Sequence, residues 1–440
     1  MRLHGTMRVN EKGHLEIGGC DTIDLARVFG TPLYVLDEAL FRENCRSYRR
    51  AFAGGNGGVL YAGKALLTLA VCRLVEEEGL GLDVVSGGEL YTAVQAGFPM
   101  DRVYFHGNNK TADEVRVALR LGVHRFVCDS IDELDLLGRL AAEQGRECSL
   151  LLRLTPGIEA HTHDYIRTGQ IDSKFGLAIL NGQALEAVRR CLEHPALRLR
   201  GLHCHIGSQI FELEPYADAA RILLAFAGRV RDVTGWVIEE LDLGGGLGIY
   251  YGPGDDPPAV ENLAETIFGA VARAAADENL PIPRILVEPG RSISGPAGTT
   301  LYTVGTVKEI PDIRTYVAVD GGMGDNPRPA LYGAKYEACL ANRMNGPIHT
   351  AGVSLAGRYC ESGDVLIRQA YLPPVRVGDL VAVSCTGAYT YSMAGNYNRY
   401  PRPAMVLVRD GSAELIVRRE SYADLIRNDV LPARFRTREA

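Results

Sequence analysis

The chain has 440 residues, 46% hydrophobic and 23% charged, and this composition argues against a largely disordered protein. The length is more than one ordinary core requires, so we expect two domains. The formal net charge of −7 argues against a nucleic-acid-binding surface, which would be basic, and favours a protein that acts on small molecules.

The N-terminal stretch MRLHGTMRVNEKGHLEIGG lacks the apolar segment of a signal peptide, and no apolar run reaches the length of a membrane helix. Ten cysteines are scattered without C-x-x-C pairs or the spacing of a disulfide framework. We therefore expect reduced thiols in a cytoplasmic protein that has neither a membrane nor a nucleic acid as partner.

Two strand-like stretches come first, HLEIGG at 14–19 and TPLYVLDE at 31–38. Eight short runs rich in Val, Leu and Ile follow, and each is almost continuously apolar, as expected of strands that are buried on both faces. They lie at 58–65, 81–86, 103–107, 125–130, 149–156, 199–208, 240–246 and 284–291.

The segments between these runs show the period of amphipathic helices. In TADEVRVALRLG, at 111–122, the side chains of Val115, Ala118 and Leu119 fall on one helical face. The segment NGQALEAVRRCLEH is predicted to begin with Asn181 as its N-cap. Eight alternations of strand and helix favour a (β/α)8 barrel, and a doubly wound open sheet stays as the alternative fold.

After Arg291 the pattern changes to β-rich stretches with Gly, Pro and Asp between them and no long helical segment. These stretches are TLYTVGTVKEI, RTYVAVDGG, DLVAVSCTGAYT and AMVLVRDGSAELIVRRE. They predict a second domain of antiparallel β structure, which the two N-terminal strand-like stretches join. We expect an N-terminal segment over 1–39, a barrel over 40–296 and a C-terminal β domain over 297–440.

Polar residues stand at the ends of the eight apolar runs, where packing explains them poorly. In a (β/α)8 barrel the active site lies at the C-terminal ends of the strands. We therefore expect one site built from several strands. Its candidate residues are Lys64, Asp83, Ser86, His106, Asp129, Arg153, His203, His205, Gly244–Gly246, Glu288 and Arg291.

Lys64 follows VLYAG and is expected to point over the barrel mouth, although a single lysine is most often a surface residue. A partly desolvated lysine has a lowered pKa and can form a Schiff base with a carbonyl group, and pyridoxal phosphate is the commonest such partner. GGGLG, at 244–248, offers backbone N–H groups for a phosphate, the alternative being a tight turn. Glu288 is well placed to keep a pyridine nitrogen protonated.

Two pairs of histidines raise the question of a metal. HCH places His203 and His205 on one face of a strand, and HTH at 161–163 forms a second pair. A third ligand at a characteristic spacing accompanies neither pair, so we predict no metal site. We prefer to place one histidine of HCH against the face of a cofactor ring.

A set of motifs runs through the chain from about Thr31 to Pro403. The motifs are YAGKALLT, GLDVVSGGEL, HGNNK, TGQIDSKFG, HCHIGSQI, LGGGLGIYY, VEPGRS, RPALYGAKYE, CESGD and GAYTYSMAGNYNRYPRP. In content and order the set resembles the diaminopimelate decarboxylases. These are pyridoxal phosphate enzymes built on a barrel plus a β domain, and they are related to ornithine and arginine decarboxylases.

The resemblance implies roles for residues around the cofactor. Lys64 would hold pyridoxal phosphate covalently, His205 would stack on its ring, and Glu288 would pair with the pyridine nitrogen. Ser208 and the Gly244–Gly246 loop would help to bind the phosphate. The full set of implied cofactor contacts is Lys64, His205, Ser208, Gly245, Gly246, Glu288, Gly290, Arg291 and Tyr389.

The resemblance also implies a substrate site and a reaction, the decarboxylation of meso-diaminopimelate to L-lysine and CO2 as the last step of lysine biosynthesis. Arg291, Arg328 and Tyr332 would bind the distal carboxylate, and Tyr389 would lie near cofactor and substrate. Glu361 would bind the distal ammonium group. Cys360, in the same CESGD loop, would donate a proton in the active site of a partner subunit, which implies a homodimer with shared sites.

Other interpretations stay open. A buried free cysteine in a β turn is the ordinary fate of a residue such as Cys360, but the neighbouring Glu361 would be awkward to bury. A related decarboxylase could act on ornithine, lysine or arginine, yet these substrates would leave Arg291 and Arg328 without an anionic partner. A catalytically silent cofactor-binding homologue and a metal-dependent hydrolase built on the paired histidines are the remaining alternatives.

Overall fold

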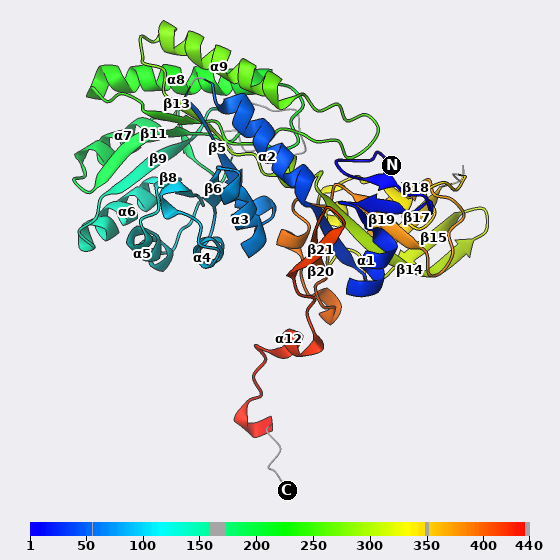
Figure 1. Cartoon of the computed structure of the whole chain (residues 1–440). Helices are drawn as coiled ribbons and strands as arrows, with labels where there is room; N and C mark the ends of the chain where they lie inside the picture. Colours follow the sequence, from blue (N-terminus) through cyan, green and yellow to red (C-terminus); the bar gives the residue numbers. More distant parts are fainter. Residues whose placement is uncertain (55, 158–172, 348–351, 436–440) are drawn as a thin grey trace. The chain divides into compact units, whose positions relative to one another are not determined.

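The computed structural model describes residues 1–54, 56–157, 173–347 and 352–435, and the chain divides into two compact units (Figure 1). The β unit consists of Met1–Asp37, Thr299–Thr386 and Met393–Ala440. The barrel unit consists of Glu38–Gly298 and the short segment Gly387–Ser392, which returns to it from far along the chain.

Eight parallel strands form the barrel unit's sheet, and the prediction of a (β/α)8 barrel is confirmed. The strands are β5 (Gly57–Ala62), β6 (Gly81–Val84), β7 (Val103–Phe105), β8 (Arg125–Cys128), β9 (Cys148–Thr155), β11 (Leu197–His203), β12 (Glu240–Asp242) and β13 (Arg284–Val287). Each pairs with its neighbour in chain order, and β13 pairs with β5, so the sheet closes on itself. The open-sheet alternative is therefore wrong. The short β10 (Leu177–Ala178) adds to the edge of β9.

The strands are joined by helices that cover the outside of the barrel. They are α2 (Glu38–Phe52), α3 (Leu69–Glu77), α4 (Gly87–Gln95), α5 (Ala112–Leu121), α6 (Ile131–Glu143), α7 (Gln183–Glu193), α8 (Glu214–Thr234), α9 (Val260–Asp277) and the short α10 (Arg291–Ser294). In Figure 1 α8 and α9 lie side by side. Their buried faces carry the apolar residues that the helical period predicts.

Local signals explain where two of these helices begin. Thr111 and Glu114 form a capping box at the start of α5, and Gly122 ends the helix in the left-handed conformation. The predicted cap of α7 is wrong by one residue, because Gly182 occupies the N-cap position. Asn181 still contributes, since its Oδ1 accepts a hydrogen bond from the Gln183 N–H at 3.1 Å.

Apolar side chains fill the barrel from the inside. Leu60, Tyr104, Val127, Leu151 and Leu286 form one buried cluster, contributed by five different strands. A filled interior leaves the strand ends as the place where polar groups can converge.

The β unit is built on a mixed sheet in the order β18–β17–β15–β14–β4–β20–β21. Its strands are β4 (Leu33–Asp37), β14 (Gly298–Ile310), β15 (Arg314–Val319), β16 (Ala338–Leu340), β17 (Val353–Ala356), β18 (Val365–Ala370), β19 (Leu380–Ser384), β20 (Ala404–Arg409) and β21 (Ser412–Val417). Most pairs are antiparallel as predicted, but β4 pairs with β20, and β15 with β17, in parallel. Strand β4 carries the N-terminal stretch into this sheet, which confirms that the N-terminal segment joins the β domain.

Three more strands and three short helices complete the β unit: β1 (Arg8–Val9), β2 (Leu15–Ile17), β3 (Cys20–Asp21), α1 (Thr22–Phe29), α11 (Arg328–Tyr332) and α12 (Tyr422–Ile426). One core cluster joins Leu15 and Ile17 to Leu33, Leu301 and Val406, so residues from both ends of the chain share a core. None of the helices in the described part of the chain is both long and apolar enough to span a bilayer.

A buried ion pair ties the loop after β7 to α6. Lys110 Nζ lies 2.6 Å from Glu133 Oε1 and also donates to the carbonyl oxygens of Gly107 and Val127, at 2.9 and 2.8 Å. Glu133 Oε2 accepts a hydrogen bond from the Asp129 N–H at 2.8 Å. Because both side chains are buried, each charge depends on the other for compensation.

We expect Lys110→Met to lower the free energy of unfolding by about 3–5 kcal/mol, because it leaves the Glu133 carboxylate buried and unpaired. Adding Glu133→Gln should recover a large part of this loss, since glutamine is neutral and keeps an acceptor for the Asp129 N–H. Urea unfolding of the single and double variants measures both values. Losses that simply add would show that the two side chains do not act as a pair.

Candidate active site

The C-terminal strand ends bring the candidate residues of the barrel unit to one end of the sheet. His203 is the last residue of β11, and Glu288 directly follows β13. His106 directly follows β7, and its N–H donates to the Val84 carbonyl oxygen at 2.8 Å. Asp83 lies within β6 and Arg153 within β9.

Lys64 lies in the 3-10 turn η1 (Gly63–Ala65), directly after β5. Burial by itself lowers the pKa of Lys64, but the negative neighbours Asp83, Tyr389 and Glu288 outweigh it, so the net pKa is raised. The sequence-based expectation of a lowered pKa is therefore wrong for the protein without a cofactor. The reason is that the pocket holds a surplus of carboxylates around this amine.

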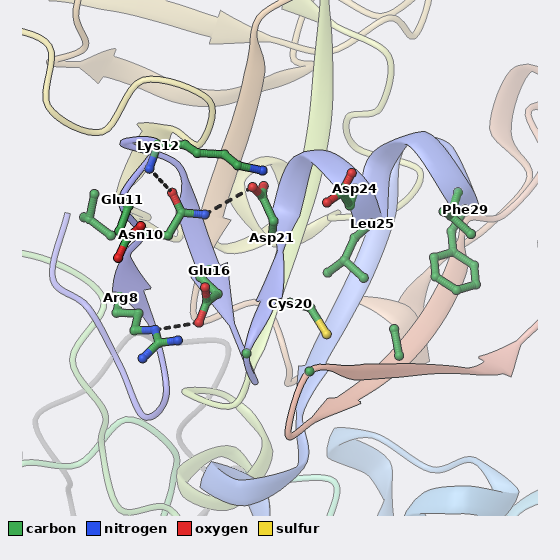
Figure 2. Close-up of a pocket in the computed structure, with 15 residues that line it drawn as sticks. Arg8, Asn10, Glu11, Lys12, Glu16, Cys20, Asp21, Asp24, Leu25 and Phe29 are labelled. Carbon is green, nitrogen blue, oxygen red and sulfur yellow. Dashed lines mark hydrogen bonds and ion pairs between the residues drawn. The ribbon is translucent and has the colours of Figure 1, made fainter.

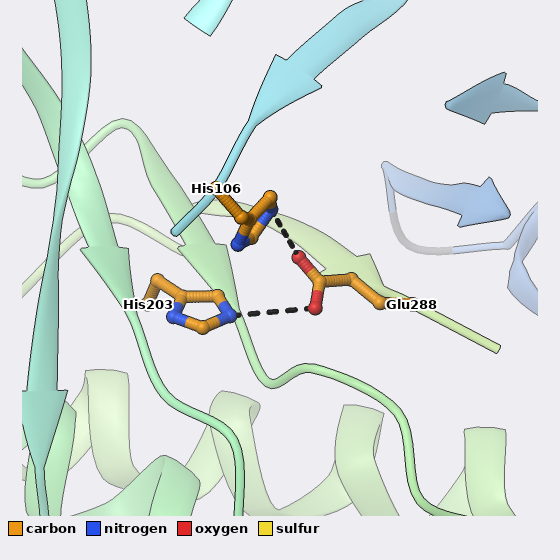
Figure 3. A group of neighbouring side chains, drawn as sticks. All are labelled: His106, His203 and Glu288. Atoms are coloured by element: carbon orange, nitrogen blue, oxygen red, sulfur yellow. Dashed lines mark hydrogen bonds and ion pairs between the residues drawn. The ribbon is translucent and has the colours of Figure 1, made fainter. Parts of the chain in front are cut away.

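Figure 3 shows that His106 and His203 flank the carboxylate of Glu288. His106 Nε2 lies 2.8 Å from Glu288 Oε1, and His203 Nε2 lies 3.4 Å from Glu288 Oε2. All three side chains are buried. Burial alone would raise the pKa of Glu288, but its histidine neighbours hold the pKa well below the ordinary value. Glu288 is thus an ionised carboxylate in the interior.

Two other buried carboxylates lie in the same region and behave in the opposite way. Burial and the negative charge of Glu288 raise the pKa of Asp242 well above its ordinary value. Burial is also the main cause of the raised pKa of Asp83. We therefore expect Glu288 to keep its charge while Asp83 and Asp242 take up protons first.

The same three residues, His106, His203 and Glu288, are of the type that can hold a metal ion. A zinc ion at about 2.0–2.1 Å from two tetrahedral ligand atoms would hold them about 3.3 Å apart. His106 Nε2 and Glu288 Oε1 are only 2.8 Å apart, the distance of a direct imidazole–carboxylate contact. That no metal is bound here remains a prediction. The short distance between His106 Nε2 and Glu288 Oε1 favours this prediction, because a shared zinc ion would hold the two atoms farther apart.

The glycine loop after β12 approaches other backbone segments closely. A Cβ atom on Gly245 would lie 2.1 Å from the Glu288 carbonyl oxygen, and one on Gly246 would lie 2.3 Å from the Gly207 carbonyl oxygen. The Gly245 N–H donates to His205 Nδ1 at 3.3 Å. Only glycine allows this approach, which forms a backbone cradle of the kind that binds phosphate.

Arg291 connects this cradle to neighbouring side chains. Its Nε and Nη2 donate to Ser208 Oγ at 3.1 and 2.8 Å, and its Nη1 donates to the Tyr251 hydroxyl at 2.8 Å. The Arg291 guanidinium lies 4.9 Å from the ring centre of Tyr389. The structure thus brings Arg291 together with Ser208 and Tyr389, which are expected at the cofactor. Tyr251 was not predicted, because nothing in IYYG distinguishes it from a packing tyrosine.

Tyr389 and Gly290 pack on the turn that carries Lys64. Tyr389 has a positive φ of 58°, and its N–H donates to the Ala65 carbonyl oxygen at 2.8 Å. A Cβ atom on Gly290 would lie 3.0 Å from the Cβ atoms of Ala62 and Ala65. The return segment Gly387–Ser392 therefore delivers Tyr389 to the barrel unit, which no motif spacing could indicate.

The remaining predicted residues belong to the β unit. Arg328 and Tyr332 are the first and last residues of α11, and buried Arg328 donates to the Tyr336 hydroxyl at 2.5 Å. Cys360 is exposed, whereas the other nine cysteines are buried or half-buried. Its N–H donates to Asn398 Oδ1 at 2.8 Å.

Asp364 shapes the loop that presents Cys360 and Glu361. Its Oδ2 accepts the Tyr359 N–H at 2.8 Å, and its Oδ1 accepts the Met323 N–H at 2.7 Å. A Cβ atom on Gly357 would lie 2.1 Å from Asp364 Oδ2, so the glycine is required by this close approach. The buried carboxylate folds GRYCESGD into a turn that exposes Cys360 and Glu361.

The barrel unit's residues fit pyridoxal phosphate in three respects. Lys64 Nζ is the amine for its carbonyl group, and the glycine cradle with Ser208 and Arg291 suits its phosphate. Glu288 Oε1 is buried and, within the described ranges, has no partner in hydrogen-bond alignment, as an acceptor for a ring N–H requires. The histidine pair HTH, at 161–163, lies outside the described residues.

A hollow of about 800 Å3 lies in the β unit, among β1, β2, β3 and α1 (Figure 2). Several polar side chains of the hollow already form hydrogen bonds with one another. Arg8 Nε donates to Glu16 at 2.5 Å, and Asn10 Nδ2 donates to Asp21 at 3.1 Å. None of the predicted site residues lines this hollow. It therefore adds nothing to the candidate site.

Comparison with known proteins gives consistent matches. Residues 38–295 match the family described as "Pyridoxal-dependent decarboxylase, pyridoxal binding domain". The chain is 54% identical to a diaminopimelate decarboxylase of Bacillus subtilis and 51% identical to one of Halalkalibacterium halodurans, with 98% of both chains covered in each case. It resembles the crystal structure of diaminopimelate decarboxylase from M. jannaschii in complex with L-lysine, with a TM-score of 0.92, 38% identity, and 98% and 99% of the two chains covered.

Glu89 makes the stability of the barrel unit depend on pH. Its Oε2 accepts the Val85 N–H at 2.7 Å, and burial raises its pKa to about 7. Since the unfolded pKa is lower, the folded state binds the proton more tightly. Stability should therefore fall as the pH rises from the unfolded pKa to about 7 and then level off.

We expect Glu89→Gln to remove this dependence. The difference in unfolding free energy between variant and wild type should grow in the variant's favour from pH 4.5 to about pH 7. The change should be at most about 3.5 kcal/mol, because each pKa unit corresponds to about 1.4 kcal/mol. Urea unfolding at several pH values measures it. A difference that does not vary with pH would contradict the raised pKa.

Proposed function

The chain belongs to the diaminopimelate decarboxylase family, and we propose that it uses pyridoxal phosphate to convert meso-diaminopimelate to L-lysine and CO2. The observation that carries the proposal is that Lys64 and the buried Glu288, whose carboxylate contacts two imidazoles, both follow barrel strands at the same end of the sheet. Whole-length identity to decarboxylases of this name supports the choice of substrate.

We assign the cofactor-holding roles as follows. When bound, pyridoxal phosphate supplies a conjugated ring that accepts the electron pair left by the departing carboxylate. Lys64 Nζ would hold the cofactor's carbonyl carbon, and His205 would lie over the ring. Ser208, Gly245 and Gly246 would bind the phosphate, and Gly290, Arg291 and Tyr389 would be further contacts of the cofactor. The hydrogen bonds between Arg291 and Ser208 support grouping these two at the cofactor.

Glu288 has the role that decides the reaction. Its ionised Oε1 would accept the ring N–H and keep the proton on the nitrogen, so that the ring draws electrons more strongly. The low pKa of Glu288 supports this role, because a protonated carboxyl group would not hold that proton by charge. Lys64 must lose a proton before its amine can react, and Asp83, its strongest negative neighbour, is our proposed acceptor.

The distal end of the substrate would be recognised by charge. We propose that Arg328, Tyr332 and Arg291 bind the distal carboxylate and that Glu361 binds the distal ammonium group. Ornithine, lysine and arginine have no distal carboxylate, and they would leave a buried arginine without an anion. A site built for a polar group can reject an analogue without it by about 10⁴-fold.

Cys360 is our proposed proton donor to the α-carbon, through its Sγ. An exposed thiol beside an exposed carboxylate supports a role in which both residues reach another surface. We therefore propose a homodimer in which the CESGD loop of one subunit completes the site of its partner. The ten free cysteines fit a reducing compartment, and we place the enzyme in the cytoplasm.

We expect the purified, cofactor-loaded protein to release CO2 from meso-diaminopimelate with lysine as product, and not from ornithine, lysine or arginine. Arg328→Met should lower kcat/KM for meso-diaminopimelate by at least about 100-fold, because a charged pair with the carboxylate is lost. Arg376→Met, an exposed arginine of the same unit, is the control and should change little. Equal activity with ornithine would contradict the carboxylate-recognition account.

Shared sites can be tested by mixing inactive subunits. Lys64→Ala and Cys360→Ala should each be nearly inactive alone, and their mixture should recover about one quarter of wild-type activity, because half the dimers would have one intact site. Lys64→Ala mixed with Glu288→Gln is the control, since both changes affect the barrel unit and no intact site can form. Absence of recovery in the first mixture, with subunit exchange shown, would rule out shared sites.

A further inference from the structure

Two buried histidines, His106 and His203, have no role in the proposed chemistry. Both are almost fully buried, with exposed fractions of 4% and 1%. Burying two imidazoles at the end of an apolar barrel is costly unless each has a partner. Their common partner is Glu288, and their rings lie edge to face with centres 5.0 Å apart.

The contacts of His203 indicate which of its two ring nitrogens carries the hydrogen atom. Burial lowers the pKa of His203 to about 4, so its imidazole is neutral at neutral pH and carries one N–H. Its Nδ1 has no hydrogen-bond partner among the residues that the structure describes, whereas its Nε2 lies 3.4 Å from Glu288 Oε2. The proton therefore belongs on Nε2, where the ring donates to the carboxylate.

The contact of His106 is closer but of a different kind. Its Nε2 lies 2.8 Å from Glu288 Oε1 and 3.7 Å from Asp83 Oδ1. The approach to Oε1 is out of line for a hydrogen bond, so that oxygen keeps a lone pair for another donor. The two histidines thus hold both carboxylate oxygens without using up the acceptor capacity of Oε1.

We propose that His106 and His203 are positioning residues that hold the Glu288 carboxylate, one on each oxygen, with Oε1 aimed at the ring nitrogen of the cofactor. This inference rests on the proposed function, because it takes Glu288 as the partner of that nitrogen. The histidines would act only through Glu288 and would not touch the substrate. Their effect should therefore appear in cofactor binding and should depend on the ring nitrogen.

The other ionisable groups around Glu288 contribute less directly. Asp83 and Asp242 are expected to take up protons before Glu288, and a side-chain hydrogen bond between Asp242 and Glu288 is one cause of the raised pKa of Asp242. The cations Lys64 and Arg153 influence Glu288 by charge alone. Within the described ranges, the ion contacts of Glu288 are those to the two histidines. Removing either imidazole leaves the buried carboxylate with one contact fewer, and losing a contact to a buried charged group is costly.

The test compares pyridoxal phosphate with 1-deazapyridoxal phosphate, which has C–H in place of the ring nitrogen. Dissociation constants for both are measured by absorbance titration of the cofactor-free protein, in wild type, His106→Leu and His203→Leu. We expect each variant to bind pyridoxal phosphate about 10- to 100-fold more weakly. Binding of the deaza analogue should change less than about threefold, because it makes no N–H contact with Glu288.

Two further variants separate positioning from packing. His106→Gln keeps an N–H donor and should recover most of the affinity for pyridoxal phosphate that His106→Leu loses. If His106→Leu fails to fold, the binding measurements are made on His106→Gln instead. His124→Leu is the control, because His124 precedes β8, at the opposite end of the strands, and contacts Tyr104 rather than Glu288.

Each outcome decides the inference. A loss restricted to pyridoxal phosphate supports it. Equal losses for both ligands would show that the histidines only pack, and no loss would show that they are dispensable. Equal binding of both ligands to wild type would refute the Glu288–nitrogen contact itself. Because binding is measured without substrate, failure of the decarboxylation assay would leave this result unaffected and overturn the proposed function alone.

Discussion

The structure depends on one buried negative charge, the carboxylate of Glu288. A carboxylate in an apolar interior would normally be protonated, because burial disfavours its charged form. Two imidazoles reverse that tendency at this position, with Nε2 atoms 2.8 and 3.4 Å from the two oxygens. Burial raises the pKa of the two neighbouring carboxylates, Asp83 and Asp242, so we expect Glu288 to be the anion at the base of the site.

The closed barrel makes this arrangement feasible. His106 follows β7 and Glu288 follows β13, strands that are separated in the sheet by β5 and β6. Closing the sheet brings these ends around one centre, while a cluster of buried apolar side chains fills the barrel interior. The buried Lys110–Glu133 pair ties down the loop after His106, because Lys110 Nζ also donates to the carbonyl oxygen of the next residue, Gly107.

Much of the barrel's organisation could be predicted from the sequence. The eight apolar runs predicted all eight barrel strands, because strands buried on both faces must be apolar throughout. The raised pKa of Lys64 and the contact of His106 with Glu288 could not be predicted. Both depend on which strand ends meet across the closed sheet, and no spacing along the chain records that. The family resemblance implied Tyr389 at the cofactor, but the pattern of strands and helices alone could not show that a return segment brings it to the barrel unit.

The most direct test of the account is the protonation state of the cofactor's ring nitrogen. The protein is loaded with pyridoxal phosphate that carries ¹⁵N in the ring, and its ¹⁵N resonance is recorded from about pH 6 to about pH 9. The account predicts the chemical shift of a protonated nitrogen throughout, because an ionised Glu288 holds its N–H. The shift of an unprotonated nitrogen in this range would contradict it.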